Sequence, residues 1–305
     1  MAEGLQVIKT AAGIVTYNPD IQRLKANIDA ITNQVYIVYC FDNGSDNINE
    51  IRRLLDAYDN VQLIGNEKNR GIAEGLNQIL KVARTMHIEW LLTLDQDSVC
   101  PDGMISEMLS HSGGDNIIAI CPLIVDRRRP VKERPKESNE YVDFCITSGC
   151  LVNMALSEKI GDFDAWLFIG QVDDEFCHRI TLNGLRILRI NKLVLDHELG
   201  DITPSKHKAF YLNLGTALHS KKLLALSYKR KVSPMRVYYS TRNMVYLSKK
   251  YKRFPNRKFT KKRAICNALS NVIRGQKKIE VAKAAIKGYK EGQHLPVKVY
   301  ERKRI

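Results

Sequence analysis

Long hydrophobic runs are missing from this chain of 305 residues. No window approaches about 18 consecutive apolar residues, which argues against a membrane-spanning helix. The N-terminal sequence, MAEGLQVIKTAAGIV, lacks the charged start, long apolar stretch and small-residue cleavage site of a signal peptide. Together these absences predict a cytoplasmic protein.

Paired cysteines are also missing, because the seven Cys residues are an odd number and none forms a CxxC pair. Several lie in apolar runs, such as Cys40 in VYIVYCF and Cys121 in IIAICPLI. We interpret the cysteines as small buried side chains in a reducing compartment.

Acidic residues are scarce near the end of the chain. Residues 249–305 contain 19 Lys or Arg and only three Glu, a net charge of +16. Since the whole chain carries +15, the first 248 residues sum to about −1. A near-neutral body with a basic tail indicates an anionic partner or a solvating role, and both anionic lipid and nucleic acid attract such segments.

Apolar runs alternate with helical patterns over the first 125 residues. The runs predict strands at 11–17, 35–41, 61–65, 90–97 and 116–125. Between them, apolar residues recur at spacings of three and four, as in a helix predicted over 71–86. Continuous apolar strands that alternate with helices predict a mainly parallel α/β sheet.

Polar clusters at 18–20, 42–46 and 95–98 follow three of these strands. Ligands bind at the carboxyl ends of the strands in such sheets, so we expect the clusters to share one edge. A polar stretch at 126–140, with two prolines, is predicted to be a mobile loop that either closes over the site or is a disordered insertion.

The sequence after this loop predicts a strand at 141–146, a helix over 172–184 and strands near 185–196. Residues 205–305 are predicted to be mostly helical. These patterns divide the chain into an α/β unit, 1–204, and a basic helical region, 205–305.

Two carboxylates flank one residue in Asp95-Gln96-Asp97, at the end of an apolar strand. Side chains placed in this way can bind one hard divalent cation, which in turn neutralises a diphosphate. The competing interpretation is a solvated turn in which Asp97 or Ser98 caps a helix.

Acidic residues also begin the helix predicted over 172–184, in Asp173-Asp174-Glu175. One of these carboxylates could act as a general base that removes a proton from an acceptor hydroxyl. The competing interpretation is that the helix dipole favours acidic residues in a first turn.

With both acidic motifs in this order, the chain resembles family 2 glycosyltransferases of the GT-A fold. It is similar in particular to bacterial rhamnosyltransferases of cell-surface polysaccharide assembly. The motifs that carry the resemblance span about residues 10–200 and are Val15-Thr16-Tyr17-Asn18-Pro19, Asp42-Asn43-Gly44-Ser45, Asn69-Arg70-Gly71-Ile72-Ala73 with Asn77, Leu94-Asp95-Gln96-Asp97-Ser98, Thr147-Ser148-Gly149-Cys150, Phe163-Asp164 and Val172-Asp173-Asp174-Glu175-Phe176-Cys177.

The resemblance implies a role for each site residue. Asp173 aligns with the catalytic base, supported by Asp174 and Glu175. A divalent cation, Mg²⁺ or Mn²⁺, would be held by Asp97 with Asp95 and His197. The residues expected to bind the nucleotide sugar are Thr16, Tyr17, Asn18, Asp42, Asn69, Arg70, Asn77, Asp95, Gln96, Ser148 and Gly149.

One departure from the subgroup precedes the base. Members often read Ile-Asp-Tyr-Val-Asp, whereas this chain reads Ile169-Gly170-Gln171-Val172-Asp173. The base is retained and an upstream acid is absent, which leaves the donor and acceptor sugars open.

The resemblance further implies inverting transfer of a sugar to a glycan or a polyprenyl-diphosphate-linked acceptor. We expect L-rhamnose from dTDP-rhamnose as the donor, with a UDP-hexose as the alternative. A protein that binds nucleotide sugars without catalysis is a second alternative, against which the retained Asp173 argues.

The basic tail has two compatible interpretations. Apolar residues recur near helical spacing within 257–290, which is typical of a basic amphipathic helix on an anionic membrane, at its inner face. The same pattern suits a helical bundle packed on the α/β unit or on a second subunit. Nucleic acid is not the expected partner, because the sequence shows no RNP-like or zinc-finger pattern.

Overall fold

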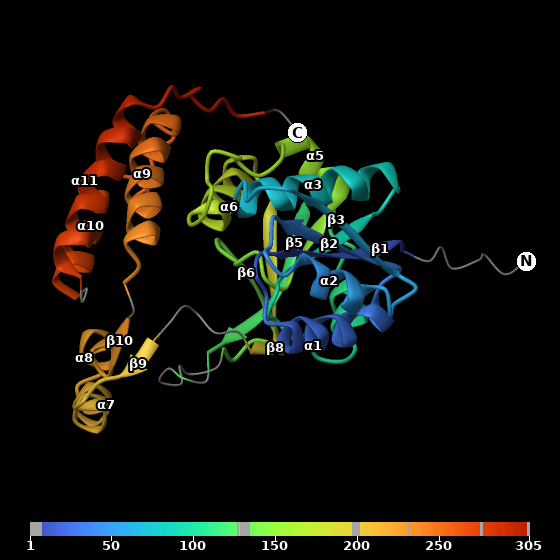
Figure 1. Ribbon diagram of the computed structural model, residues 1–305, viewed down its shortest axis with the longest axis horizontal. Coiled ribbons are helices and arrows are strands. Elements are labelled where there is room, and N and C mark those ends of the chain that lie inside the picture. The colour runs from blue at the N-terminus through green and yellow to red at the C-terminus, as the bar shows by residue number, and fades with distance from the viewer. Residues whose placement is uncertain are drawn as a thin grey trace, which may run out of the picture.

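The computed structural model of the chain describes residues 8–126, 128, 135–196, 202–230, 232–274 and 277–303. It consists of an α/β body and a C-terminal region of helices that stands against one side of the body (Figure 1). No helix of the described ranges is long and apolar enough to cross a bilayer.

An eight-stranded sheet forms the centre of the body, in the order β3-β2-β1-β4-β7-β5-β8-β6. Its strands are β1 (Thr10–Thr16), β2 (Ile37–Asn43), β3 (Val61–Asn66), β4 (Trp90–Asp95), β5 (Ile117–Val125), β6 (Asn139–Val142), β7 (Cys150–Asn153) and β8 (Arg186–Asp196). Strands β1 to β4 pair in parallel, as do β5 and β8. Strand β7 is antiparallel to both β4 and β5, and β6 is antiparallel to β8. The mainly parallel sheet is confirmed.

Helices cover both faces of the sheet (Figure 1). They are α1 (Ile21–Ile31), α2 (Ile48–Leu55), α3 (Ile72–Thr85), α4 (Met104–Leu109), α5 (Met154–Ile160) and α6 (Val172–Leu182). One core cluster buries α3 and α6 residues such as Ile79 and Phe176, and a second buries α1 residues such as Leu24 and Ile28. Burial on both faces explains why the strands are apolar without alternation.

One predicted strand differs from the structure, and much of the loop predicted at 126–140 lies outside the described residues. The strand expected at 141–146 is instead β6, which ends at Val142 because its pairing with β8 ends at Ile187. The unit predicted to end at residue 204 includes β9 (Ile202–Pro204), which pairs with β10 (Tyr228–Arg230) of the C-terminal region.

The C-terminal region is helical, as the sequence predicted. Its helices are α7 (Lys208–Ala217), α8 (Lys221–Leu226), α9 (Pro234–Lys250), α10 (Lys261–Arg274) and α11 (Lys278–His294). Helix α11 approaches α9 closely, because a Cβ at Gly292 would lie 2.6 Å from the Arg242 carbonyl oxygen. Glycine therefore allows the two backbones to come together.

Candidate active site

The carboxyl ends of β1, β2 and β4 meet at one edge of the sheet. Thr16 pairs with Asp42 across β1 and β2, and Val15 pairs with Asp95 across β1 and β4. The polar clusters that follow these strands therefore lie together, as the sequence predicted. This edge is the place at which such sheets bind ligands.

Asp42 is held within the chain. Its Oδ1 accepts hydrogen bonds from Thr16 Oγ1 at 3.1 Å and Ser45 Oγ at 2.5 Å. Its Oδ2 accepts from the backbone N–H groups of Gly44 at 3.1 Å and Ser45 at 2.9 Å. A carboxylate has about four acceptor positions, and both Asp42 and Thr16 are buried. These side chains therefore shape the loop, and their expected contact with a nucleotide stays a prediction.

Tyr17 and Asn18 follow β1 and are fixed through their backbone. The Tyr17 N–H donates to Gln96 Oε1 at 2.8 Å, and the Asn18 N–H donates to Ser45 Oγ at 2.8 Å. Asn18 adopts a left-handed conformation with φ of 45°. The Tyr17 side chain stays 48% exposed, so its ring is open to stack on a planar ligand.

Residues from the loop before α3 are fixed in a similar way. The Arg70 N–H donates to Asn43 Oδ1 at 2.9 Å, and Asn69 Oδ1 accepts from the Gly71 N–H at 2.9 Å. The Arg70 side chain is exposed, so its guanidinium can reach a bound anion. Asn43 was not among the predicted site residues.

Asn77 has a different role from the expected one. Its Nδ2 donates to the Phe163 carbonyl oxygen at 2.9 Å, and its Oδ1 accepts from the Phe163 N–H at 2.9 Å. Both ends of the amide are engaged in holding α3 to the segment that precedes α6. Asn77 therefore has a packing role, and its expected contact with a nucleotide stays a prediction.

The loop that carries Ser148 and Gly149 is joined to the end of β4. Ser148 Oγ lies 2.5 Å from Ser98 Oγ and accepts from the Asp95 N–H at 3.3 Å. The Gly149 N–H donates to the Thr93 carbonyl oxygen at 2.8 Å, and Gly149 has a φ of 80° that favours glycine. The structure thus brings these two predicted residues beside Asp95.

Asp95 and Asp97 stand at the end of β4. Asp95 is partly exposed, and Asp97 is exposed with its carbonyl oxygen bound by Arg23 Nε at 2.7 Å. The third predicted ligand, His197, lies outside the described residues. Within the described ranges no group of three or more His, Cys, Asp or Glu could hold a metal ion. Two carboxylates nevertheless fit Mg²⁺, which is often held by one or two carboxylates and the phosphates of a substrate.

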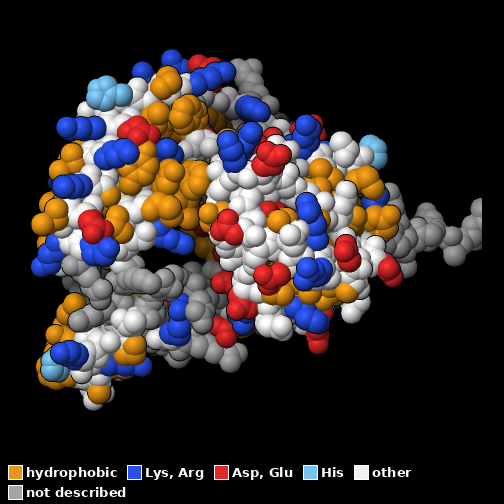
Figure 2. Space-filling model, viewed as in Figure 1, with side chains coloured by type: hydrophobic (Ala, Val, Ile, Leu, Met, Phe, Trp, Pro, Cys, Tyr) orange, Lys and Arg blue, Asp and Glu red, His pale blue; other side chains and the backbone are white. Residues whose placement is uncertain are grey.

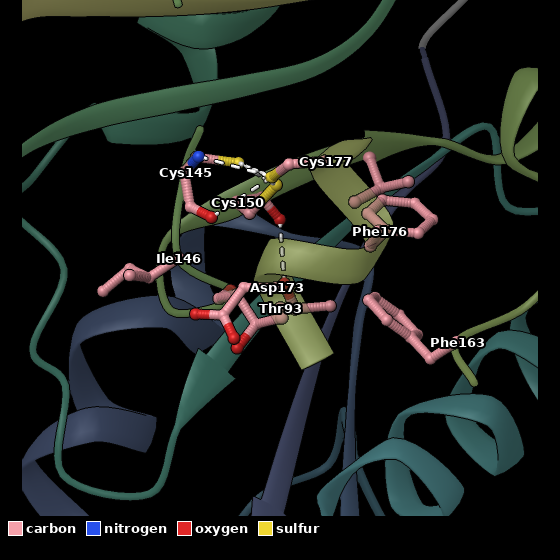
Figure 3. A pocket seen from close by; sticks show the side chains of 10 residues that line it. Thr93, Cys145, Ile146, Cys150, Phe163, Asp173, Phe176 and Cys177 are labelled. Atoms are coloured by element: carbon pink, nitrogen blue, oxygen red, sulfur yellow. Dashed lines mark hydrogen bonds between the residues drawn. The ribbon is translucent and has the colours of Figure 1, made fainter. Parts of the chain in front are cut away.

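Asp173 lies in the first turn of α6, on the wall of a cavity of about 10 Å³. This volume is about that of one water. Figure 3 shows the Asp173 carboxylate beside Thr93 of β4, which lines the same cavity. Gly170 and Gln171, with φ of 80° and 59°, turn the chain into the helix. Glycine at 170 suits this left-handed backbone at the position where the subgroup often has an acid.

Burial raises the pKa of Asp173 to about 7, and the charges of Asp174 and Asp95 add to the shift. An effect of Asp95 on Asp173 means that the end of β4 and the start of α6 share one electrostatic environment. Thr93 of β4 and Asp173 of α6 line one cavity, and the convergence of the two acidic motifs on a shared site stays a prediction. A carboxylate with a pKa near neutrality is suited to accept a proton.

Three buried thiols lie behind Asp173 (Figure 3). Cys145 Sγ lies 3.6 Å from Cys150 Sγ and 3.9 Å from Cys177 Sγ. Six of the seven cysteines are free and buried, as predicted, whereas Cys266 on α10 is exposed. The thiols fill the space between β7 and α6 as small hydrophobic side chains.

Asp174 forms an ion pair with a lysine of the C-terminal region. Lys258 Nζ lies 2.8 Å from Asp174 Oδ1 and 4.4 Å from the centre of the Phe144 ring. Lys258 belongs to the segment between α9 and α10, so the basic region contributes directly to the surroundings of Asp173. No motif in the sequence pointed to Lys258.

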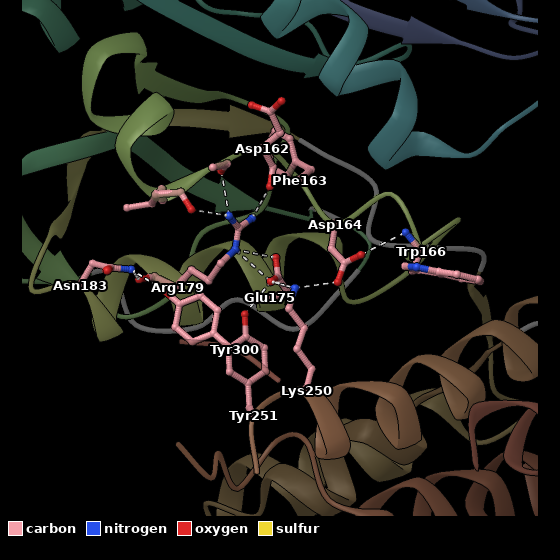
Figure 4. A network of polar contacts seen from close by, with 12 residues as sticks. Asp162, Phe163, Asp164, Trp166, Glu175, Arg179, Asn183, Lys250, Tyr251 and Tyr300 are labelled. Atoms are coloured by element: carbon pink, nitrogen blue, oxygen red, sulfur yellow. Dashed lines mark hydrogen bonds and ion pairs between the residues drawn. The ribbon is translucent and has the colours of Figure 1, made fainter. Parts of the chain in front are cut away.

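Glu175 faces the other way, into a buried ionic network (Figure 4). Its carboxylate lies 2.9 Å from Arg179 Nε and 2.7 Å from Lys250 Nζ, and it accepts from Tyr251 Oη at 2.6 Å. Burial alone would raise the pKa of Glu175, but the charges of Arg179 and Lys250 outweigh it and lower the pKa to about 2. Glu175 thus has a structural role that joins α6 to α9, and its expected support of catalysis stays a prediction.

Comparisons with known proteins identify the family and the fold of the chain. The chain is similar to a Shigella flexneri protein named dTDP-rhamnosyl transferase RfbF, with 27% identity over 255 residues that cover 78% of this chain and 79% of the relative. Among solved structures, S. aureus TarS 1-349 has a TM-score of 0.53 and 16% identity, with 93% of this chain and 89% of that chain covered.

GalNAc-T7, solved with UDP, GalNAc and Mn²⁺, has a TM-score of 0.53 and 14% identity. The match covers 79% of this chain and 51% of the GalNAc-T7 chain, so this chain spans about half the length of that structure. Both structures are GT-A glycosyltransferases, which confirms the predicted fold. A family profile described as Glycosyl transferase family 2 matches residues 12–175, more than half of the 305 residues, and the chain therefore belongs to this family.

Proposed function

We propose that this glycosyltransferase moves a sugar from a nucleotide sugar to an acceptor hydroxyl with inversion, and that Asp173 is the general base. The observation that carries the proposal is the Asp173 carboxylate, which is partly exposed, has a pKa near 7 and is influenced by Asp95 at the end of β4. A base with a pKa near the working pH combines a large ionised fraction with a useful affinity for protons.

The donor would lie along the edge formed by β1, β2 and β4. The exposed ring of Tyr17 would stack on the base, and the exposed Arg70 side chain would pair with the diphosphate. Ser148 and Gly149, fixed against β4, would form the wall next to the sugar. A Mg²⁺ or Mn²⁺ ion held by Asp97 and Asp95 would supply charge neutralisation for the leaving diphosphate.

Asp173 would take the proton from the acceptor hydroxyl as the hydroxyl oxygen attacks the anomeric carbon. The new C–O bond forms on the face opposite to the bond that breaks, and the electron pair of the broken bond stays on the nucleoside diphosphate. A single displacement inverts the anomeric configuration. It needs no nucleophilic residue besides the acceptor.

The donor proposed is dTDP-rhamnose, with a UDP-hexose as the alternative. The name of the Shigella flexneri relative supports the first, and the UDP in the GalNAc-T7 structure supports the second. A thermal-shift screen of both donors with Mg²⁺ or Mn²⁺ separates them. A ligand at a hundredfold excess over its Kd stabilises the fold by about 2.7 kcal/mol, so only the correct donor gives a large shift.

The acceptor proposed is a glycan or a polyprenyl-diphosphate-linked saccharide at the inner face of an anionic membrane. Supporting this, hydrophobic and basic side chains lie side by side over the C-terminal helices (Figure 2). The exposed apolar side chains of α10 and α11 are Ile265, Leu269, Ile273, Ile279 and Ile286. Because this surface combines apolar and basic groups, it suits anionic lipid better than a second, equally basic subunit or a nucleic acid.

Replacement of Asp173 tests the proposal. In Asp173→Asn the transfer rate should fall by about 10²–10⁴, because the amide cannot accept the proton, while nucleotide affinity stays unchanged. The control is Asp162→Asn, which removes an exposed carboxylate paired with Arg84 at the surface and should keep the parent rate. A parent-like rate in Asp173→Asn would remove Asp173 from the mechanism. A parent that binds the donor but never transfers the sugar would favour a binding protein without catalysis.

A further inference from the structure

A second cavity lies in the C-terminal region, outside the site of Asp173. Its volume is about 360 Å³. It is lined by Ser248, Lys249, Lys252, Lys261, Val297 and Val299. Three of these six side chains are cationic and none of them is acidic, so the lining has a strong positive charge.

Lys249 is fixed in place at this cavity. Its Nζ donates to the carbonyl oxygens of Gly292, Gln293 and Leu295 at 3.2, 2.6 and 2.7 Å. Burial lowers the pKa of Lys249, and the charge of Lys261 lowers it further. These hydrogen bonds hold the Lys249 ammonium group at the end of α11, so it influences the cavity through its charge alone.

Lys252 and Lys261 are the other two lysines of the lining. Both are exposed, and their ammonium groups make no hydrogen bond or ion pair with the part of the chain that the structure describes. Each has three donors available. Two free ammonium groups on one cavity, next to the hydrogen-bonded ammonium group of Lys249, repel each other unless an anion lies between them.

Helix α10 adds to this positive potential. It begins at Lys261, and its first turn contains Lys262 and Arg263 but no acidic residue. The first turn of a helix carries the positive end of the dipole, which favours anions and disfavours cations. The basic residues thus stand at the less favourable end of α10, and an anion in the cavity would relieve this repulsion.

We propose that this cavity is a second anion site, which binds the phosphate or diphosphate group of a ligand. The volume of about 360 Å³ is sufficient for such a group, since small-molecule sites range over about 300–1,000 Å³. Lys252 and Lys261 supply the donors to phosphate oxygens. Val297 and Val299 form an apolar wall, which suits a phosphate that is esterified to an organic group.

The position of the cavity connects the membrane-facing helices to the helix of the base. Lys250 and Tyr251, which lie between Lys249 and Lys252 in sequence, both contact Glu175 of α6. Helix α10 leads from the cavity to the exposed Ile265 and Leu269. A lipid phosphate bound there would therefore lie between the apolar face of α10 and the α6 helix.

Calorimetry with inorganic pyrophosphate tests the site. The parent for this test is the full chain carrying Arg70→Gln, which removes the diphosphate contact proposed for the nucleotide pocket, and it is titrated without divalent metal. We expect binding by the parent and a loss of about tenfold or more in affinity for Lys252→Gln with Lys261→Gln, because hydrogen bonds to charged groups are lost. The matched control, Lys278→Gln with Lys283→Gln, removes two exposed charges of α11 outside the lining and should bind as the parent does.

The proposal is overturned if the parent does not bind pyrophosphate under these conditions, or if both double variants bind equally well. Flotation with phosphatidylcholine vesicles, with and without phosphatidic acid, identifies the source of the phosphate. If the Lys252 and Lys261 variant alone loses binding to the acidic vesicles, the ligand is a lipid phosphate. If only pyrophosphate binding is lost, the ligand is a soluble phosphate. Neither assay measures transfer, so a failure here leaves the role of Asp173 untouched.

Discussion

The first turn of α6 places two acidic residues in environments that shift their pKa values in opposite directions. Asp173 faces the end of β4, where burial and neighbouring carboxylates raise its pKa to about 7. Glu175, two positions later, is fully buried against α9, where cations outweigh burial and lower its pKa to about 2. The comparison teaches that the partners of a carboxylate, and not its presence in an acidic motif, decide whether it can accept a proton.

The largest effect on stability is expected from Glu175→Gln. Removing this carboxylate leaves Arg179 without its buried counter-ion and Lys250 with Asp164 alone, which should lower the free energy of unfolding by about 3–5 kcal/mol. Urea unfolding measures the change. The surface variant Asp162→Asn, at a partly exposed pair with Arg84, should lose at most about 1 kcal/mol. If the two variants unfold alike, the ionic network does not hold α6 to α9.

A smaller effect of opposite sign is expected from Asp173→Asn. The pKa of Asp173 is higher in the folded chain than its ordinary value, so the folded state binds the proton more tightly than the unfolded state. The contribution of Asp173 to the free energy of unfolding is therefore fully present at low pH and is lost as the pH rises through about 7. In Asp173→Asn this side chain gains no charge as the pH rises. The free energy of unfolding at alkaline pH should therefore be higher than that of the parent by roughly 2 kcal/mol.

Thermal unfolding of this variant and the parent at several pH values measures the difference. The gain should shrink as the pH falls below about 7 and vanish below the ordinary pKa of an aspartate, where Asp173 is protonated in both states. A gain that does not change with pH would show that the pKa of Asp173 is not raised.

Much of the fold could be predicted from local patterns. The apolar runs predicted the strands β1 to β5, because a strand buried on both faces must be apolar throughout. Parallel pairing then fixed the edge at which Asp42 and Asp95 lie. The antiparallel strand β7 was not predicted, since four residues, Cys150–Asn153, are too short to show a pattern.

The site was harder to predict, because a sequence does not show what a polar side chain faces. Asn77 bonds to the backbone of Phe163, 86 residues away, and Asp42 bonds to its own loop. The contact of Lys258 with Asp174 spans 84 residues. Contacts over such distances leave no periodicity in the chain, so neither their presence nor their partners could be derived locally.

The pH dependence of kcat/KM for sugar transfer tests the central claim most directly, because it reports the ionisation of the base in the free enzyme. We predict that kcat/KM rises with pH and reaches half of its maximum near the Asp173 pKa of about 7, and that the residual activity of Asp173→Asn lacks this rise. A parent profile that is already flat between about pH 5.5 and 8 would contradict the assignment of Asp173 as a base whose pKa is raised by burial.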